Sequence, residues 1–246
     1  MSDFIAKARK LAGIFPVEGW RTALRRHRVA AGVEHARILR NLEPIRTVVD
    51  IGANRGQFAL VARHCFPEAR IVSFEPLAGP AGIYRAVFGD DERTTLVEAA
   101  VGPQAGAAEI HLSERDDSSS LLPITERQDE LFPGTAESGT ASIRVVRLAD
   151  VLAAQEIAAP ALLKLDVQGF ELQALEGSED VLPRFDWVYV ECSFVELYAG
   201  QALADQVIAW LRERGFRLVG VFNMTYDGAD RAIQADFLFA QEDKSI

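Results

Sequence analysis

The sequence predicts an α/β fold in which a mostly parallel sheet carries helices on both faces and ends with an antiparallel last strand. After Pro44, short apolar runs alternate with longer amphipathic stretches, the pattern of a parallel sheet covered by helices. The last two apolar runs are too close together for a helical crossover, so they are expected to pair antiparallel. With 246 residues, 49% of them hydrophobic, the chain has enough apolar side chains for a real core.

The first 44 residues predict a helical extension that precedes the main domain. They contain no β-branched run, and Val17, Trp20 and Leu24 recur at helical spacing. The main domain is assigned to residues 45–246. Its expected strands are, in order, Thr47–Ile51, Arg70–Phe74, Thr94–Glu98, Ala161–Val167, Trp187–Cys192, Phe216–Phe222 and Ala235–Ala240.

Helices are expected between these strands, at Gly56–Cys65 and Ala202–Arg214, the second of which ends before the C-capping residue Gly215. One polar stretch, residues 114–141, does not fit the alternation. It lies between two strand-like segments, Glu109–Leu112 and Ile143–Val146. Loops of this length are usually functional lids or disordered insertions, and both readings stay open at this point.

Charge and composition exclude several classes of protein. The net charge of −10 divides into +6 over residues 1–46 and −16 over the rest, so the main domain is a poor candidate for nucleic-acid binding. No apolar run is long enough to cross a bilayer, and no signal-peptide pattern is present, so a soluble cytoplasmic protein is expected. Cys65 and Cys192 lie in apolar stretches and are expected to be free thiols.

The strongest local pattern is a glycine loop that follows the first predicted strand and opens a helix. Its glycines are four residues apart, and the backbone N–H groups and the positive end of the helix are expected to face a bound carboxylate or phosphate. Asn54 stands where a glycine is common, and asparagine tolerates positive φ. The candidate cofactor-binding residues here are Asp50, Gly52, Ala53, Asn54, Gly56, Gln57 and Phe58.

Acidic residues follow the predicted strands. Glu75, followed by Pro76, ends the second strand 19 residues beyond Gly56, where a carboxylate can accept hydrogen bonds from ribose hydroxyls. Together with it, the acids at or near strand ends are Asp50, Glu98, Asp166 and Glu191. Because open α/β sheets bind ligands along this edge, the five acids predict a site there. Glu171 enters the helix after Asp166 and is also a candidate.

Several motifs in one order resemble a known family. They are Asp50-Ile-Gly-Ala-Asn-Arg-Gly-Gln-Phe58, the Ser-Phe-Glu-Pro that ends at Pro76, the segment Ser118–Leu121, and Lys164-Leu-Asp-Val-Gln-Gly-Phe-Glu171 followed by Leu175-Glu-Gly-Ser178. Over about residues 45–240 the chain is similar to the FkbM-type methyltransferases. One departure is Gln168, where the family often has Glu. Residues 1–44 lie outside the resemblance.

The resemblance implies a class I methyltransferase (Rossmann-like) sheet, the cofactor S-adenosylmethionine, and O-methylation of a hydroxyl on a sugar, glycan precursor, polyketide or related natural product. It implies that the glycine loop holds the methionine end of the cofactor, Glu75 the ribose hydroxyls, and the segment with Glu98 and Ala100 the adenine. Asp166 would lie near the cofactor's amino group or the incoming hydroxyl. In the polar stretch, Ser118, Ser119 and Ser120 become candidates for a substrate loop.

The catalytic group and the reaction class stay open. A general base would assist an alcohol acceptor, and the candidates are Asp166, Glu191 and Glu171, with His111 as an outsider. No metal-ligand spacing is present, so no metal is predicted, although carboxylates at one edge could hold Mg²⁺. An NAD(P)-dependent oxidoreductase and a non-catalytic cofactor-binding partner subunit are the alternatives. The partner is a small-molecule or glycan acceptor, and a homo-oligomer is compatible with the sequence.

Overall fold

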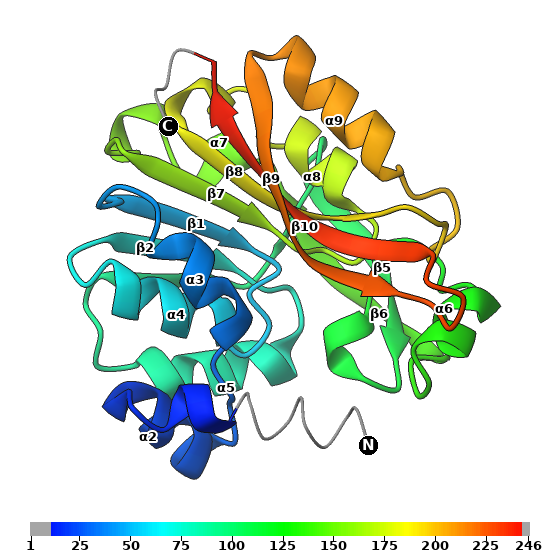
Figure 1. Ribbon diagram of the computed structural model, residues 1–246, viewed down its shortest axis with the longest axis horizontal. Coiled ribbons are helices and arrows are strands. Elements are labelled where there is room, and N and C mark those ends of the chain that lie inside the picture. Colours follow the sequence, from blue (N-terminus) through cyan, green and yellow to red (C-terminus); the bar gives the residue numbers. More distant parts are fainter. Residues whose placement is uncertain (1–10, 243–246) are drawn as a thin grey trace.

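The computed structural model describes residues 11–242, and the ends of the predicted extension (1–10) and of the predicted main domain (243–246) lie outside this range. A seven-stranded sheet forms the centre of the molecule, with strand order β3-β2-β1-β7-β8-β10-β9 (Figure 1). The strands are β1 (Thr47–Ile51), β2 (Arg70–Phe74), β3 (Thr94–Val97), β7 (Ala161–Leu165), β8 (Trp187–Ser193), β9 (Phe216–Tyr226) and β10 (Ala232–Gln241).

The central sheet is parallel except at β10. Strand β10 pairs antiparallel with both β8 and β9, as the short connection between the last two predicted strands required. The direction of chain connection reverses at β1, which lies between β2 and β7. In open α/β sheets such a reversal opens a crevice beyond the carboxyl ends of the strands. The fold therefore places the ends of β1, β2 and β7 around one site.

Helices cover both faces of the central sheet, as predicted. On one face lie α2, α3, α4 and α5, and on the other lie α8 and α9 (Figure 1). The α-helices are α2 (Glu18–His27), α3 (Ala36–Leu39), α4 (Gln57–Cys65), α5 (Ala78–Phe88), α6 (Glu126–Leu131), α7 (Leu148–Val151), α8 (Glu171–Glu176) and α9 (Ala204–Glu213). Single 3-10 turns are η1 (Val33–His35), η2 (Asp116–Ser118), η3 (Ala154–Glu156) and η4 (Leu182–Arg184).

The N-terminal segment packs on the α4 face of the sheet. Trp20 is buried and donates a hydrogen bond from its indole Nε1 to the carbonyl of Leu60 in α4. Leu39 is also fully buried in the hydrophobic cluster that contains Phe58. Burial of large aromatic and aliphatic side chains is the dominant stabilising term in packing of this kind. Residues 11–44 thus share a core with the sheet.

The polar stretch at residues 114–141 is more regular than its sequence suggested. A second sheet has the order β4-β6-β5, with β4 (Ala100–Val101), β5 (Gly106–Ser113) and β6 (Glu137–Val146). The expectation of a loop over the whole stretch was wrong for residues 137–141, which belong to β6, and for 126–131, which form α6. The polar strand residues are exposed on β6, so hydrophobic periodicity could not reveal them.

Candidate active site

The glycine loop lies closest to the end of β7 at Gly52. This residue has φ of +80°, and a Cβ added to it would lie 1.8 Å from the carbonyl oxygen of Asp166. Gly56 has φ of +92° and Asn54 has φ of +47°, so the left-handed conformation expected for Asn54 is present. The loop therefore holds the ends of β1 and β7 in direct backbone contact.

The N–H groups of this loop are used inside the protein, which differs from the expectation that they face a ligand. Gly52 and Ala53 donate to the carbonyl of Phe74, and Gly56 donates to the carbonyl of Ala53. Asn54 donates to the Glu75 carboxylate. The start of α4 at Gln57 carries the N–H groups that lack intrahelical acceptors, so the positive end of this helix is the part that an anionic group can approach.

Glu75, the carboxylate predicted to bind ribose hydroxyls, directly follows β2 and lines a cavity. Its Oε2 accepts from the N–H of Asn54 at 2.9 Å, and its Oε1 accepts from the N–H of Leu77 at 2.8 Å. The side chain is 5% exposed, and burial raises the pKa of its carboxyl to about 7, against the two backbone hydrogen bonds. Two backbone donors fix the orientation of the carboxyl group at the wall of a cavity.

The cavity lies along the carboxyl edge of the central sheet and has a volume of about 410 Å³. That volume is within the range of about 300–1,000 Å³ that holds small ligands. Nine of the predicted cofactor residues line it: Gly52, Ala53, Asn54, Gln57, Phe58, Glu75, Pro76, Ala100 and Asp166. The predicted substrate-loop residues Ser118, Ser119 and Ser120 also line it.

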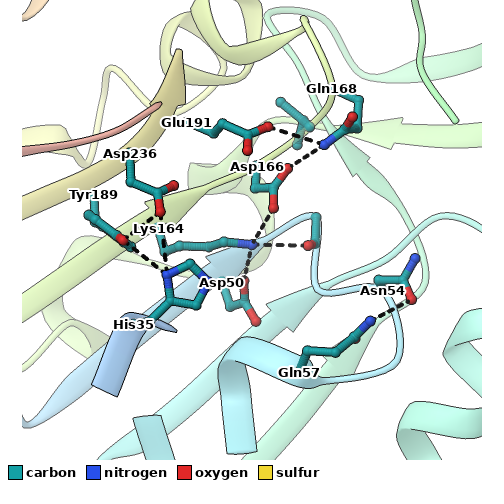
Figure 2. A network of polar contacts seen from close by, with 12 residues as sticks. His35, Asp50, Asn54, Gln57, Lys164, Asp166, Gln168, Tyr189, Glu191 and Asp236 are labelled. Carbon is teal, nitrogen blue, oxygen red and sulfur yellow. Dashed lines mark hydrogen bonds and ion pairs between the residues drawn. The ribbon is translucent and has the colours of Figure 1, made fainter. Parts of the chain in front are cut away.

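A buried lysine joins two of the strand-end acids (Figure 2). The Nζ atom of Lys164 lies 3.0 Å from Asp50 Oδ1 and 3.8 Å from Asp166 Oδ2, and it donates to the carbonyl of Gly52 at 3.1 Å. Burial lowers the pKa of this lysine, but the nearby carboxylates outweigh burial and raise it. The Asp50 side chain is fully buried, so this acid serves as the counter-ion of Lys164 and leaves Asp166 at the cavity.

Gln168 connects Asp166 to Glu191. Its Nε2 donates to Asp166 Oδ1 at 2.7 Å and lies 3.3 Å from Glu191 Oε2, and its Oε1 lies 2.7 Å from the hydroxyl of Tyr198. Glu191 Oε1 accepts a further hydrogen bond from Gln234 at 2.8 Å. Burial and the neighbouring carboxylates raise the pKa of Glu191. An amide at position 168 supplies a donor to two acids that a third carboxylate would repel.

A second group of hydrogen-bonded side chains reaches the cavity and begins at His35 in the N-terminal segment. His35 lines the cavity, and its Nδ1 lies 2.9 Å from the hydroxyl oxygen of Tyr189 and 3.5 Å from Asp236 Oδ2. Tyr189 donates its only proton to Asp236 at 2.8 Å, and Asn223 donates to the same carboxylate oxygen at 2.7 Å. Figure 2 shows His35, Tyr189 and Asp236 beside Lys164 on the same face of the sheet.

Five of the predicted site residues do not line the cavity: Asp50, Gly56, Glu98, Glu171 and Glu191. Glu98 forms an ion pair with Arg85 on the surface. Glu171 is buried, and its Oε1 accepts from the N–H groups of Val167 and Gly169, which fixes the turn after β7. Glu191 reaches the site through Gln168. The outsider His111 pairs with Glu137 on the second sheet.

The serines of the predicted substrate loop, Ser118–Ser120, form hydrogen bonds that fix this segment along one side of the cavity. Ser120 Oγ donates to the carbonyl of Gln168 at 2.6 Å and accepts from the N–H of Leu122 at 3.0 Å. Ser119 Oγ accepts from the N–H of Ser113 at 3.1 Å. These contacts fix the loop against the end of β7, next to Asp166.

Sequence reasoning missed four members of the site. Lys164 and Asp236 carried a usable signal, because each is a charged residue inside an apolar strand run and a buried charge requires a partner. Tyr189 and His35 carried none, because their contact joins residues 154 positions apart.

Other findings bear on metals, thiols and membranes. Among residues 11–242, no group of three or more His, Cys, Asp or Glu side chains is arranged to hold a metal ion. Both cysteines are free, as predicted, with Cys192 buried and Cys65 half-buried. Within the same residues, no helix has the length and apolar character needed to span a membrane.

The mostly parallel sheet with an antiparallel β10, the glycine loop and the carboxyl-edge cavity define an α/β fold of the class I methyltransferase type. Residues 50–218 match the methyltransferase FkbM domain, so the chain belongs to the FkbM methyltransferase family. This confirms the resemblance of its motifs. His35 and Asp236 lie outside the matched residues.

Two relatives match this chain over most of their own length. The 2-O-methyltransferase NoeI of Sinorhizobium fredii is 28% identical over 79% of this chain and 82% of its own. The 31-O-demethyl-FK506 methyltransferase FkbM of Streptomyces tacrolimicus is 29% identical over 77% of this chain and 79% of its own. Among solved structures, a putative tRNA (m1A22) methyltransferase of Streptococcus pneumoniae, in complex with S-adenosyl-L-methionine, aligns with a TM-score of 0.48 and 10% identity over 86% of this chain and 74% of that chain.

Proposed function

We propose that this protein is an S-adenosylmethionine-dependent O-methyltransferase that acts on a hydroxyl of a sugar, glycan precursor or natural product. The observation that carries the proposal is the cavity at the carboxyl edge, in which Glu75 and the glycine loop lie at one end and Asp166 and His35 line the wall. Membership of the FkbM family supports methyl transfer. The names of two relatives, a 2-O-methyltransferase and a 31-O-demethyl-FK506 methyltransferase, support oxygen as the acceptor atom.

The residues at the β1 and β2 ends fit the proposed cofactor. The carboxyl group of Glu75 is held by two backbone donors and faces the cavity, where it accepts hydrogen bonds from two ribose hydroxyls. The start of α4 receives the amino-acid carboxylate, and the apolar segment Ala99–Val101 lines the adenine side. When bound, S-adenosylmethionine supplies an electrophilic methyl group, and the protein has to align the acceptor with it.

The residues at the β7 end are placed to hold the acceptor. Asp166 faces the cavity with 36% of its side chain exposed, while Lys164 and Gln168 fix its carboxylate from behind. A carboxylate held in this way accepts a hydrogen bond from a neighbouring hydroxyl of the acceptor and orients it. The loop around Ser118–Ser120 closes the same side. We therefore propose that residues 114–136 form the substrate loop.

A labelling screen tests the proposal. The protein is incubated with methyl-labelled S-adenosylmethionine and a panel of UDP- and dTDP-hexoses, methyl glycosides and lipid-linked saccharides, and the methylated oxygen of each product is mapped. We expect label on a hydroxyl oxygen. Asp166→Ala is expected to lower transfer at least 100-fold while it keeps part of the cofactor affinity, and Asp150→Ala, an exposed acid, is the matched control. Label on nitrogen or carbon would contradict O-methylation.

A further inference from the structure

The imidazole of His35, in the N-terminal segment, lines the cavity, and one of its two ring nitrogens already has a hydrogen-bond partner inside the protein. His35 Nδ1 lies 2.9 Å from the oxygen of Tyr189, and Tyr189 donates its proton to Asp236. Because a tyrosine hydroxyl has a single proton, its oxygen must accept from His35, which places the imidazole proton on Nδ1. Nε2 of His35 has no hydrogen-bond partner among the described residues and carries the free lone pair.

We propose that His35 is the general base of the methyl transfer, oriented by Tyr189 and Asp236. This rests on the proposed function and names the group that takes the acceptor's proton. As the acceptor oxygen forms its bond to the methyl carbon, the carbon–sulfur bond breaks and its electron pair stays on sulfur. The hydroxyl proton passes to His35 Nε2. The imidazolium so formed keeps its Nδ1–H toward Tyr189 and the Asp236 carboxylate, 3.5 Å away.

The other candidate bases are less suited to accept this proton. Asp166 already accepts a hydrogen bond from Gln168 at Oδ1, and its Oδ2 lies 3.8 Å from the Lys164 ammonium, so both of its oxygens are engaged inside the protein. The carboxylates of Glu191 and Glu171 are occupied by amide and backbone donors and do not line the cavity.

The surroundings of His35 are charged on several elements. Asp236 on β10 and Tyr189 on β8 contact the imidazole directly. Asp50 on β1 and Lys164 on β7 lie behind it on the same face of the sheet, where they form an ion pair, and Figure 2 shows the three side chains together. The centroid of the Phe58 ring lies 5.4 Å from that of the His35 ring, in an edge-to-face arrangement. Within this set, the Asp236 carboxylate is the group that pairs with an imidazolium.

The first experiment measures which ring nitrogen of His35 carries the proton, in the absence of cofactor and acceptor. Long-range ¹H–¹⁵N spectra of the protein at pH 8 are expected to show His35 as the Nδ1–H tautomer. In Tyr189→Phe the acceptor of that proton is removed, so we expect the population to shift toward Nε2–H. His111→Gln identifies one unrelated imidazole signal and leaves that of His35 unchanged. A wild-type His35 with the proton on Nε2 would overturn the proposal, because no lone pair would then face the cavity.

The second experiment reads catalysis with the same panel of acceptors and labelled cofactor. His35→Gln is expected to lower kcat by about 10²–10⁴-fold with cofactor affinity within threefold of wild type. In His35→Ala, added imidazole is expected to restore part of the activity. The control His111→Gln keeps wild-type kcat. A kcat for His35→Gln within threefold of wild type would refute the base while leaving the methyltransferase proposal standing. A wild type that transfers no label to any panel member would instead refute the proposed function, and with it the role of His35 as a base, even where the tautomer is the expected one.

Discussion

Lys164 and Asp50 stand directly opposite each other on the paired strands β7 and β1, with Lys164 Nζ 3.0 Å from Asp50 Oδ1. Both side chains are almost completely buried. The same ammonium donates to the carbonyl of Gly52 and lies 3.8 Å from Asp166. One buried cation therefore links the glycine loop, the core of the sheet and the acid that faces the cavity.

Removal of Lys164 is expected to be costly to stability. In Lys164→Met the Asp50 carboxylate loses its cation inside the sheet, and the free energy of unfolding should fall by about 3–5 kcal/mol. The double variant Asp50→Asn/Lys164→Met should lose less than the single variant, because no charge is left buried. Urea denaturation measures both. Arg93→Met breaks an exposed ion pair with Glu68 and should cost less than about 1 kcal/mol. Equal losses in Lys164→Met and Arg93→Met would refute this role.

The contact between Gly52 and Asp166 can be separated from backbone strain by two alanine variants. Gly52 and Gly134 have φ of +80° and +85°, but only at Gly52 would a Cβ meet another atom within 4 Å. Each alanine carries about 1–2 kcal/mol of left-handed strain. Gly52→Ala should cost at least about 2 kcal/mol more than Gly134→Ala and should also lower methyl transfer, because Asp166 has to move. Similar unfolding midpoints for the two variants would show that the contact between Gly52 and the carbonyl of Asp166 is not tight.

Stability should depend on pH through Glu171. Burial raises the pKa of its carboxyl from 4.5 to about 7 in the folded protein. Between these values the unfolded chain has released the proton and the folded chain retains it, so a rise in pH favours unfolding, by about 1.4 kcal/mol per pH unit at most. Glu171→Gln should remove the contribution of Glu171 to this fall in the free energy of unfolding. Glu75 has the same direction of shift, so part of the slope should remain until Glu75→Gln is added. Urea denaturation at pH 5, 6 and 7 measures the slope, and an unchanged slope in the double variant would contradict the account.

The hydrogen bond between Ser120 and the carbonyl of Gln168 is expected to matter for the acceptor. Ser120→Ala removes a bond worth about 1 kcal/mol, and a loosened loop should raise the acceptor KM about fivefold with little change in cofactor affinity. Ser138→Ala is the matched control, since Ser138 Oγ donates to the carbonyl of Leu112 on the exposed second sheet. A KM for Ser120→Ala equal to that of Ser138→Ala would remove the loop from acceptor binding.

The parts of the fold that depend on local patterns were predictable. The positions of the strands along the sequence followed from apolar runs, and the antiparallel pairing of β10 followed from a short connection. The left-handed backbone conformation of Asn54 followed from its place in the loop. The second sheet was only partly predictable, because β6 exposes polar residues on its outer half.

The cavity wall at the β1 and β2 ends was predictable because its residues are consecutive and carry a motif. The part of the cavity around the end of β7 was not predictable, since it is built from pairings such as His35 with Tyr189 and Gln168 with Glu191, which only tertiary packing brings together. Glu171 illustrates the limit of the acid pattern. Its place after a strand is that of a site residue, yet its carboxyl is occupied by the backbone of the adjacent turn.

Equilibrium dialysis with labelled S-adenosylmethionine and, separately, with labelled NADH tests the central claim most directly. We expect the wild-type protein to retain S-adenosylmethionine and not NADH. We expect Glu75→Ala to lower the retention of S-adenosylmethionine at least tenfold, while Glu98→Ala, at the surface, leaves it unchanged. Retention of NADH in place of S-adenosylmethionine, or equal retention by the two variants, would contradict the assignment of this cavity to a methyl donor.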